Sequence, residues 1–198
     1  MSIKAVIFDL DGTLTEPFFD FDAIRQEMGL DSDAGPVLEV MKSMEPGERK
    51  RAEEILHFHE LRAVEESKLN PGAKKTLDSL RDAGIFIGVL TRNHRSNAEA
   101  VARKHNLKFD SIVDREDGPA KPDAFGVLKL CRQFGVLPEE CLVVGDYLFD
   151  LLCARAAGAG AVLLMNHKRA DEFAEHADFN IENVEQVLEL VKKMKDKT

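Results

Sequence analysis

Residues 6–17, VIFDLDGTLTEP, place two aspartates, Asp9 and Asp11, at the end of an apolar run and before a glycine. Residues i and i+2 of an extended chain point to the same side, so the two carboxylates come together. Like charges this close are stable mainly beside a cation, and a set of oxygen ligands suits Mg²⁺. The stretch therefore predicts a magnesium site at the end of a buried strand.

Two simpler interpretations of the same stretch are weaker. A calcium loop of the D-x-D-x-D-G type would need a ligand at Ile7 and a glutamate at Phe18, and neither is present. A turn or helix-cap role would suit any single aspartate, but it leaves unexplained the matching polar residues further along the chain.

Short aliphatic runs recur along the chain and indicate strands covered on both faces. They span residues 3–10, 85–91, 141–146 and 160–165, with a weaker run at 109–113. Helical patterns fill the intervals at 72–84, 96–107, 122–136 and 149–160, with a last one near the end of the chain, and Ser96 is the expected N-cap of the second. Strands that alternate with helices predict an α/β fold, a Rossmann-like parallel sheet with right-handed crossovers.

One segment departs from this alternation. Residues 16–70 contain no strand-like run and carry helical, highly charged patterns. We therefore expect an α/β core domain from residues 1–15 and 71–198, and a small α-helical cap domain from residues 16–70, inserted after the first strand.

Composition narrows the function classes. The 198 residues carry a formal net charge of −9, which disfavours nucleic acid and anionic membranes as partners. No stretch approaches the length of a membrane span, and the first residues lack the pattern of a signal peptide. Three cysteines without metal-site spacing indicate reduced thiols, so we expect a cytoplasmic protein.

Polar residues also follow three later segments. Thr91 ends the second predicted strand, with Arg92 and Asn93 behind it as candidates for phosphate contact. Lys121 stands just before a proline and a predicted helix, and Asp146 ends another strand, with Asp150 four residues on. Ligands of open parallel sheets bind beyond the carboxyl ends of the strands, so we expect these side chains to meet Asp9 and Asp11.

This series of motifs, DLDGT, LTRN, AKPD and VVGDYLFD, resembles that of the haloacid dehalogenase superfamily over nearly the whole chain. The chain is most similar to phosphoglycolate-phosphatase-like members with a small helical cap. The resemblance implies an HAD-like fold and a Mg²⁺-dependent phosphatase acting through an aspartyl-phosphate.

The resemblance implies a role for each motif residue. Asp9 would be the nucleophile and Asp11 the general acid and base, whose main-chain carbonyl also touches the metal. Thr91 would hydrogen-bond the phosphoryl group, and Lys121 would neutralise its charge and orient Asp9. Asp146 would complete the metal site with Asp9 and Asp11, and Asp150 would act in the outer coordination sphere.

Chemistry favours phosphate esters over halides, because a halide leaves without a proton and would not need the acid Asp11. Two alternatives share the fold: a phosphotransferase of the sugar-phosphate mutase type and a non-catalytic binding protein. The mutase would need a second acid–base group from residues 16–70, where no clear candidate stands, and the binding protein would usually lack one of the key aspartates. We expect a monomer that acts on a small phosphorylated metabolite.

Overall fold

The computed structural model describes residues 2–195. These residues divide into two compact units, one formed by residues 2–17 and 68–195 and the other by residues 18–67. No helix of the described residues is long and apolar enough to cross a membrane.

The larger unit is built on a six-stranded parallel sheet with the strand order β3-β2-β1-β4-β5-β6. Its strands are β1 (Ala5–Phe8), β2 (Phe86–Leu90), β3 (Ser111–Val113), β4 (Cys141–Gly145), β5 (Gly160–Leu164) and β6 (Phe179–Ile181). All four residues of β1 and all five of β4 are buried, as expected for the middle of a sheet covered on both faces. The predicted α/β class and parallel sheet are confirmed.

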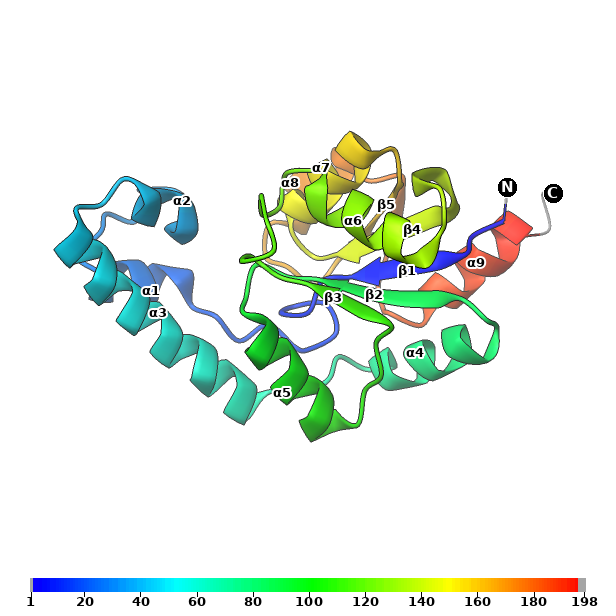
Figure 1. The fold of residues 1–198 in the computed structure, drawn as a ribbon, viewed down its shortest axis with the longest axis horizontal. Helices are drawn as coiled ribbons and strands as arrows, with labels where there is room; N and C mark the ends of the chain where they lie inside the picture. Colours follow the sequence, from blue (N-terminus) through cyan, green and yellow to red (C-terminus); the bar gives the residue numbers. More distant parts are fainter. Residues whose placement is uncertain (1, 196–198) are drawn as a thin grey trace. The chain divides into compact units, whose positions relative to one another are not determined.

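Helices cover both faces of this sheet. They are α4 (Ala73–Asp82), α5 (Arg95–His105), α6 (Phe125–Phe134), α7 (Leu148–Ala157), α8 (Ala170–Phe173) and α9 (Gln186–Lys195). In Figure 1, α4, α5 and α9 lie on one face, and α6 and α7 lie on the other. The apolar cluster under α6 and α7 includes Ile7, Leu130, Val143, Leu151 and Leu163.

The sequence did not predict β6. This edge strand has three residues and pairs with β5, and its central Asn180 is exposed. An interval this short, with a polar residue at its middle, lacks the continuous apolarity that marks the buried strands.

The smaller unit is entirely helical, as predicted for the segment after the first strand. Its helices are α1 (Phe21–Glu27), α2 (Val37–Lys42) and α3 (Pro46–Glu66). Asp20 caps α1 by accepting hydrogen bonds from the backbone N–H groups of Asp22 and Ala23. The unit has its own apolar cluster, formed by Ile24, Val37, Met41, Ala52 and Leu56.

Candidate active site

Three neighbouring strands deliver the predicted polar residues to one edge of the sheet. Asp9 follows β1, Thr91 follows β2 and Asp146 follows β4, and β1 lies between the other two strands. The chain adds β2 and β3 on one side of β1 and β4, β5 and β6 on the other. This edge is therefore the switch point at which open parallel sheets bind ligands.

Lys121 lies between two carboxylates at this edge. Its Nζ is 2.6 Å from Asp9 Oδ1 and 2.5 Å from Asp150 Oδ1. The lysine is 4% exposed and Asp150 only 2%. Because a buried ammonium is costly unless it is paired, these two ion pairs fix where the lysine must lie.

Asp146 joins the same cluster from the end of β4. Carboxylate oxygens of Asp9, Asp146 and Asp150 all lie within 4.8 Å of one another. The buried hydroxyl of Thr13 donates a hydrogen bond to Asp146 Oδ1 over 3.1 Å. Gly12 has a φ of +92°, and a Cβ there would come within 2.5 Å of Asp146 Oδ2. The loop after β1 thus needs a glycine in order to pass over the carboxylate.

Burial and mutual repulsion shift the pKa values of this cluster. Burial and then the charges of Asp9 and Asp150 raise the pKa of Asp146 well above its ordinary value. Burial raises the pKa of Asp150 to about 6, with Asp9 adding to the shift and Lys121 opposing it. Burial alone would lower the pKa of Lys121, but the charges of Asp150 and Asp9 raise it above its ordinary value.

These observations fit a divalent cation. Three buried carboxylates surround a single ammonium, so the cluster has an excess of negative charge and exclusively oxygen ligands. A hard divalent ion such as Mg²⁺ is the species that such a donor set accommodates.

Two asparagines hold the loop after β1. The Nδ2 group of Asn70 lies 3.0, 2.8 and 3.0 Å from the carbonyl oxygens of Gly12, Thr13 and Thr15. Asn166 donates a further hydrogen bond to the Gly12 carbonyl over 2.7 Å. The loop that follows Asp9 and Asp11 is therefore clamped from two distant parts of the chain.

The loop after β2 brings Thr91, Arg92 and Asn93 to the same edge. Thr91 Oγ1 accepts a hydrogen bond from the backbone N–H of Asn93 over 3.0 Å. Arg92 donates to the Lys121 carbonyl over 2.6 Å, and its guanidinium lies 4.8 Å from the centre of the Phe149 ring. Arg92 thus ties this loop to the segment that carries Lys121.

Asp11 meets this loop through Asn93. The Nδ2 group of Asn93 donates to Asp11 Oδ2 over 3.2 Å, and Asn93 is 5% exposed. The Asn93 amide thus contacts the carboxylate of Asp11 from the loop after β2, two residues along the chain from Asp9.

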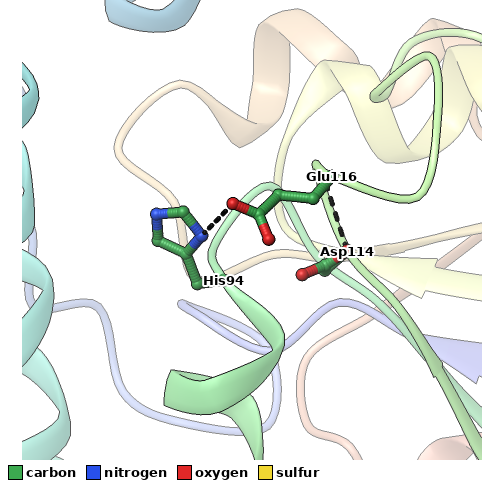
Figure 2. Close-up of side chains that lie close together, drawn as sticks. All are labelled: His94, Asp114 and Glu116. Atoms are coloured by element: carbon green, nitrogen blue, oxygen red, sulfur yellow. Dashed lines mark hydrogen bonds and ion pairs between the residues drawn. The ribbon is translucent and has the colours of Figure 1, made fainter.

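A second group of possible metal ligands, His94, Asp114 and Glu116, lies beside the start of α5 (Figure 2). Asp114 accepts hydrogen bonds from the backbone N–H groups of Arg95 over 2.7 Å and of Glu116 over 3.2 Å. Nε2 of His94 lies 2.5 Å from a guanidinium nitrogen of Arg115, a cation that would repel a metal ion. Within this group, Asp114 serves to cap the start of α5. The expected N-cap, Ser96, was wrong, because His94 occupies that position and Asp114 satisfies the first N–H of the helix.

Sequence reasoning missed four residues that support the site: Thr13, Asn70, Asn97 and Asn166. Thr13 is the only one of these inside a recognised motif, since it belongs to DGT. Asn70 and Asn166 act through contacts between distant segments, such as the 154 residues that separate Asn166 from Gly12. A single sequence carries no signal for such pairings.

Comparison with known proteins agrees with this architecture. Residues 3–158 match the family of haloacid dehalogenase-like hydrolases. The chain is 31% identical to the hydrolase YOR131C of Saccharomyces cerevisiae, over 97% of this chain and 92% of the relative. It is 26% identical to a phosphoglycolate phosphatase of Chromobacterium violaceum, over 96% and 97% of the two chains.

A crystal structure of a hydrolase from Pseudomonas syringae has the same fold. It superposes with a TM-score of 0.83 over 96% of this chain and 99% of the other, at 23% identity. The family match covers all four motifs from Asp9 to Asp150, which confirms the resemblance drawn from them. The chain belongs to the haloacid dehalogenase-like hydrolases.

Proposed function

We propose that the protein is a Mg²⁺-dependent phosphatase that hydrolyses a small phosphorylated metabolite through an aspartyl-phosphate on Asp9. The observation that carries the proposal is the cluster of Asp9, Asp146 and Asp150 around Lys121, with Asp11 two residues beyond Asp9. The similarity to a phosphoglycolate phosphatase supports a phosphate ester as substrate.

In the first step the Asp9 carboxylate attacks phosphorus, an O–P bond forms, and the ester P–O bond breaks. Asp11 gives its proton to the leaving oxygen. In the second step Asp11 takes a proton from water as that water attacks phosphorus, which releases phosphate and restores Asp9.

A carboxylate that approaches a phosphate dianion meets strong repulsion, so charge neutralisation is the main requirement. Lys121 supplies one positive charge, and Thr91, Arg92 and Asn93 supply hydrogen-bond donors for phosphoryl oxygens. Asp9, Asp146 and the Asp11 carbonyl would hold Mg²⁺, with Asp150 in its outer coordination sphere. When bound, the ion neutralises charge on the transferring group.

We further propose that residues 16–70 form the cap domain and residues 1–15 and 71–198 the core domain, with the cap contributing to the choice of substrate. The net charge of −9 supports a monomer that binds neither nucleic acid nor membranes. Three free, buried cysteines support a cytoplasmic location.

The test is phosphate release from a panel of phosphorylated metabolites that includes phosphoglycolate, in Mg²⁺ and in EDTA. We expect release in Mg²⁺, loss in EDTA, and loss in Asp9→Asn, which keeps the shape of the side chain but removes the nucleophilic charge. No release by folded protein from any compound, or undiminished release by Asp9→Asn, would overturn the proposal. Phosphate retained on a sugar would instead indicate a mutase.

A further inference from the structure

Asn97 is a buried polar residue on a helix face that otherwise carries small apolar side chains. It is 4% exposed, and its buried neighbours on α5 are Ala98 and Val101. A carboxamide at such a position costs free energy unless it is hydrogen-bonded, so its partner is informative. That partner is a side chain of the active site: Asn97 Nδ2 donates to Asn93 Oδ1 over 2.8 Å.

The orientation of the Asn93 carboxamide follows from a second contact. The backbone N–H of His94, which can only donate, lies 2.8 Å from the same Asn93 oxygen. Two donors therefore converge on Oδ1. The Nδ2 group must then face the other way, where it donates to Asp11 Oδ2 over 3.2 Å.

We propose that Asn97 is a positioning residue that fixes the Asn93 carboxamide so that its N–H, and not its oxygen, meets Asp11. The inference rests on the proposed function, in which Asp11 protonates the leaving oxygen. Asn97 lies four residues beyond Asn93, and its amide belongs to the first turns of α5. Through Asn97, α5 thus sets the orientation of the Asn93 carboxamide that contacts Asp11.

A positioning role for the acid has a chemical signature that a loss of stability lacks. The leaving oxygen of an alkyl phosphate needs a proton, whereas p-nitrophenolate is stable without one. The specificity constant kcat/KM covers the steps up to phosphoryl transfer to Asp9, so it excludes the later hydrolysis in which Asp11 acts as a base. A displaced Asp11 should slow alkyl phosphates more than p-nitrophenyl phosphate.

The experiment compares Asn97→Leu, which keeps the volume but cannot donate, with Val101→Ala, which loosens the same helix face. For Asn97→Leu we expect kcat/KM to fall about 10-fold for the alkyl phosphate and less than about threefold for p-nitrophenyl phosphate. Val101→Ala should change kcat/KM by the same factor for both substrates. The proposal would be overturned if kcat/KM in Asn97→Leu fell by the same factor for both substrates. It would also be overturned if Val101→Ala slowed the alkyl phosphate more than p-nitrophenyl phosphate.

A third variant tests the direction of the hydrogen bond. In Asn97→Asp the carboxylate can accept from Asn93 but cannot donate to it, so it should turn the carboxamide and place Oδ1 against Asp11. We expect a larger selective loss for the alkyl phosphate than in Asn97→Leu. A smaller loss would contradict the orientation.

A measurement without turnover separates this inference from the proposed function. Hydrogen exchange of the Asn93 side-chain amide, followed by NMR, should be faster in Asn97→Leu than in the wild type and unchanged in Val101→Ala. Unchanged exchange in Asn97→Leu would overturn the positioning role, whether or not the protein hydrolyses either ester. If the wild type hydrolyses neither ester and no compound of the metabolite panel, the proposed function fails and amide exchange still decides the role of Asn97.

Discussion

For the individual residues of the site, the main physical constraint is the burial of several carboxylates beside one lysine. Lys121 pairs with Asp9 and Asp150, while the Asp146 carboxylate lies in the same cluster and is repelled by both of the other carboxylates. The motifs predicted each of these residues, because Asp9 and Asp146 end apolar runs, Lys121 precedes a proline and a helical pattern, and Asp150 follows four residues after Asp146. The pairing of Lys121 with Asp150 was not predicted, since the two residues lie 29 positions apart in the chain and a single sequence carries no signal for such a contact.

Replacing Lys121 by methionine should leave two buried carboxylates without their counter-ion. We expect the free energy of unfolding in EDTA to fall by about 3 kcal/mol at about pH 8, where Asp150 is ionised. Chemical denaturation measures the change. The matched control is Lys129→Met, because Lys129 pairs with Asp117 at 30% exposure, and its loss should cost less than about 1 kcal/mol. Equal losses of the free energy of unfolding in both variants would contradict the prediction that the buried, unpaired carboxylates cause the loss.

Gly12→Ala should disrupt the site by a steric clash. The new Cβ would meet the Asp146 carboxylate at 2.5 Å, whereas at Gly29, which has a similar φ of +74°, a Cβ would meet no atom within 4 Å. Both alanines carry the backbone strain of about 1 kcal/mol, so the difference between them isolates the clash. We expect Gly12→Ala to lose Mg²⁺-dependent phosphate release and Gly29→Ala to retain it. Similar activity in the two variants would show that the close approach is unimportant.

Among the helices and strands, those with a clear local sequence pattern could be predicted. The buried strands of the sheet centre were predicted because each is a continuous apolar run, and the helices because of their periodicity. The short edge strand β6 lacked that pattern. The cap of α5 was wrong for another reason: Asp114, 19 residues from Arg95, supplies the acceptor that Ser96 was expected to provide.

Asp117 links three elements and should contribute to stability in a pH-dependent way. Its carboxylate pairs with Arg95 of α5 at 2.7 Å and with Lys129 of α6 at 2.6 Å, and it follows β3. Burial raises its pKa, but the hydrogen bonds from Lys129 and the Asp114 N–H and the charge of Arg95 outweigh it and lower the pKa from 3.8 to about 2.

A lowered pKa means that the folded state favours the charged form. The stabilisation is therefore complete above the ordinary value of 3.8 and is lost as the pH falls through about 2. We expect Asp117→Asn to be less stable than the wild type by about 1 kcal/mol at about pH 5, with the difference vanishing near pH 2. Urea unfolding across that range measures it. A difference that grows as the pH falls would contradict the sign of this effect.

At the scale of the whole molecule, every residue of the proposed catalytic set belongs to the larger unit. The chain leaves and re-enters that unit at adjacent points: the Glu16 N–H donates to the Lys68 carbonyl over 2.9 Å, and Thr15 bridges to Leu69. Sequence alone indicated the helical insert from the lack of strand patterns, but it could not show that the two ends of the insert are hydrogen-bonded to each other.

Replacing residues 18–67 by a short glycine–serine linker should therefore leave a folded core. We expect a single cooperative unfolding transition and Mg²⁺-dependent release from p-nitrophenyl phosphate, because the sheet and the carboxylate cluster are complete without the insert. The kcat/KM for the best metabolite should fall by at least about 10-fold, since the insert is proposed to select the substrate. Loss of the cooperative transition would show that the larger unit does not fold alone.

In the proposed mechanism Asp9 carries the phosphoryl group during turnover. The most direct measurement is rapid acid quench of the enzyme during hydrolysis of its best substrate in Mg²⁺, followed by mass spectrometry of the peptide that contains Asp9. We expect one phosphoryl group on Asp9 that forms and decays within a turnover and is absent in Asp9→Asn. Turnover with no phosphoryl group on the protein, or with the group on another residue, would contradict it.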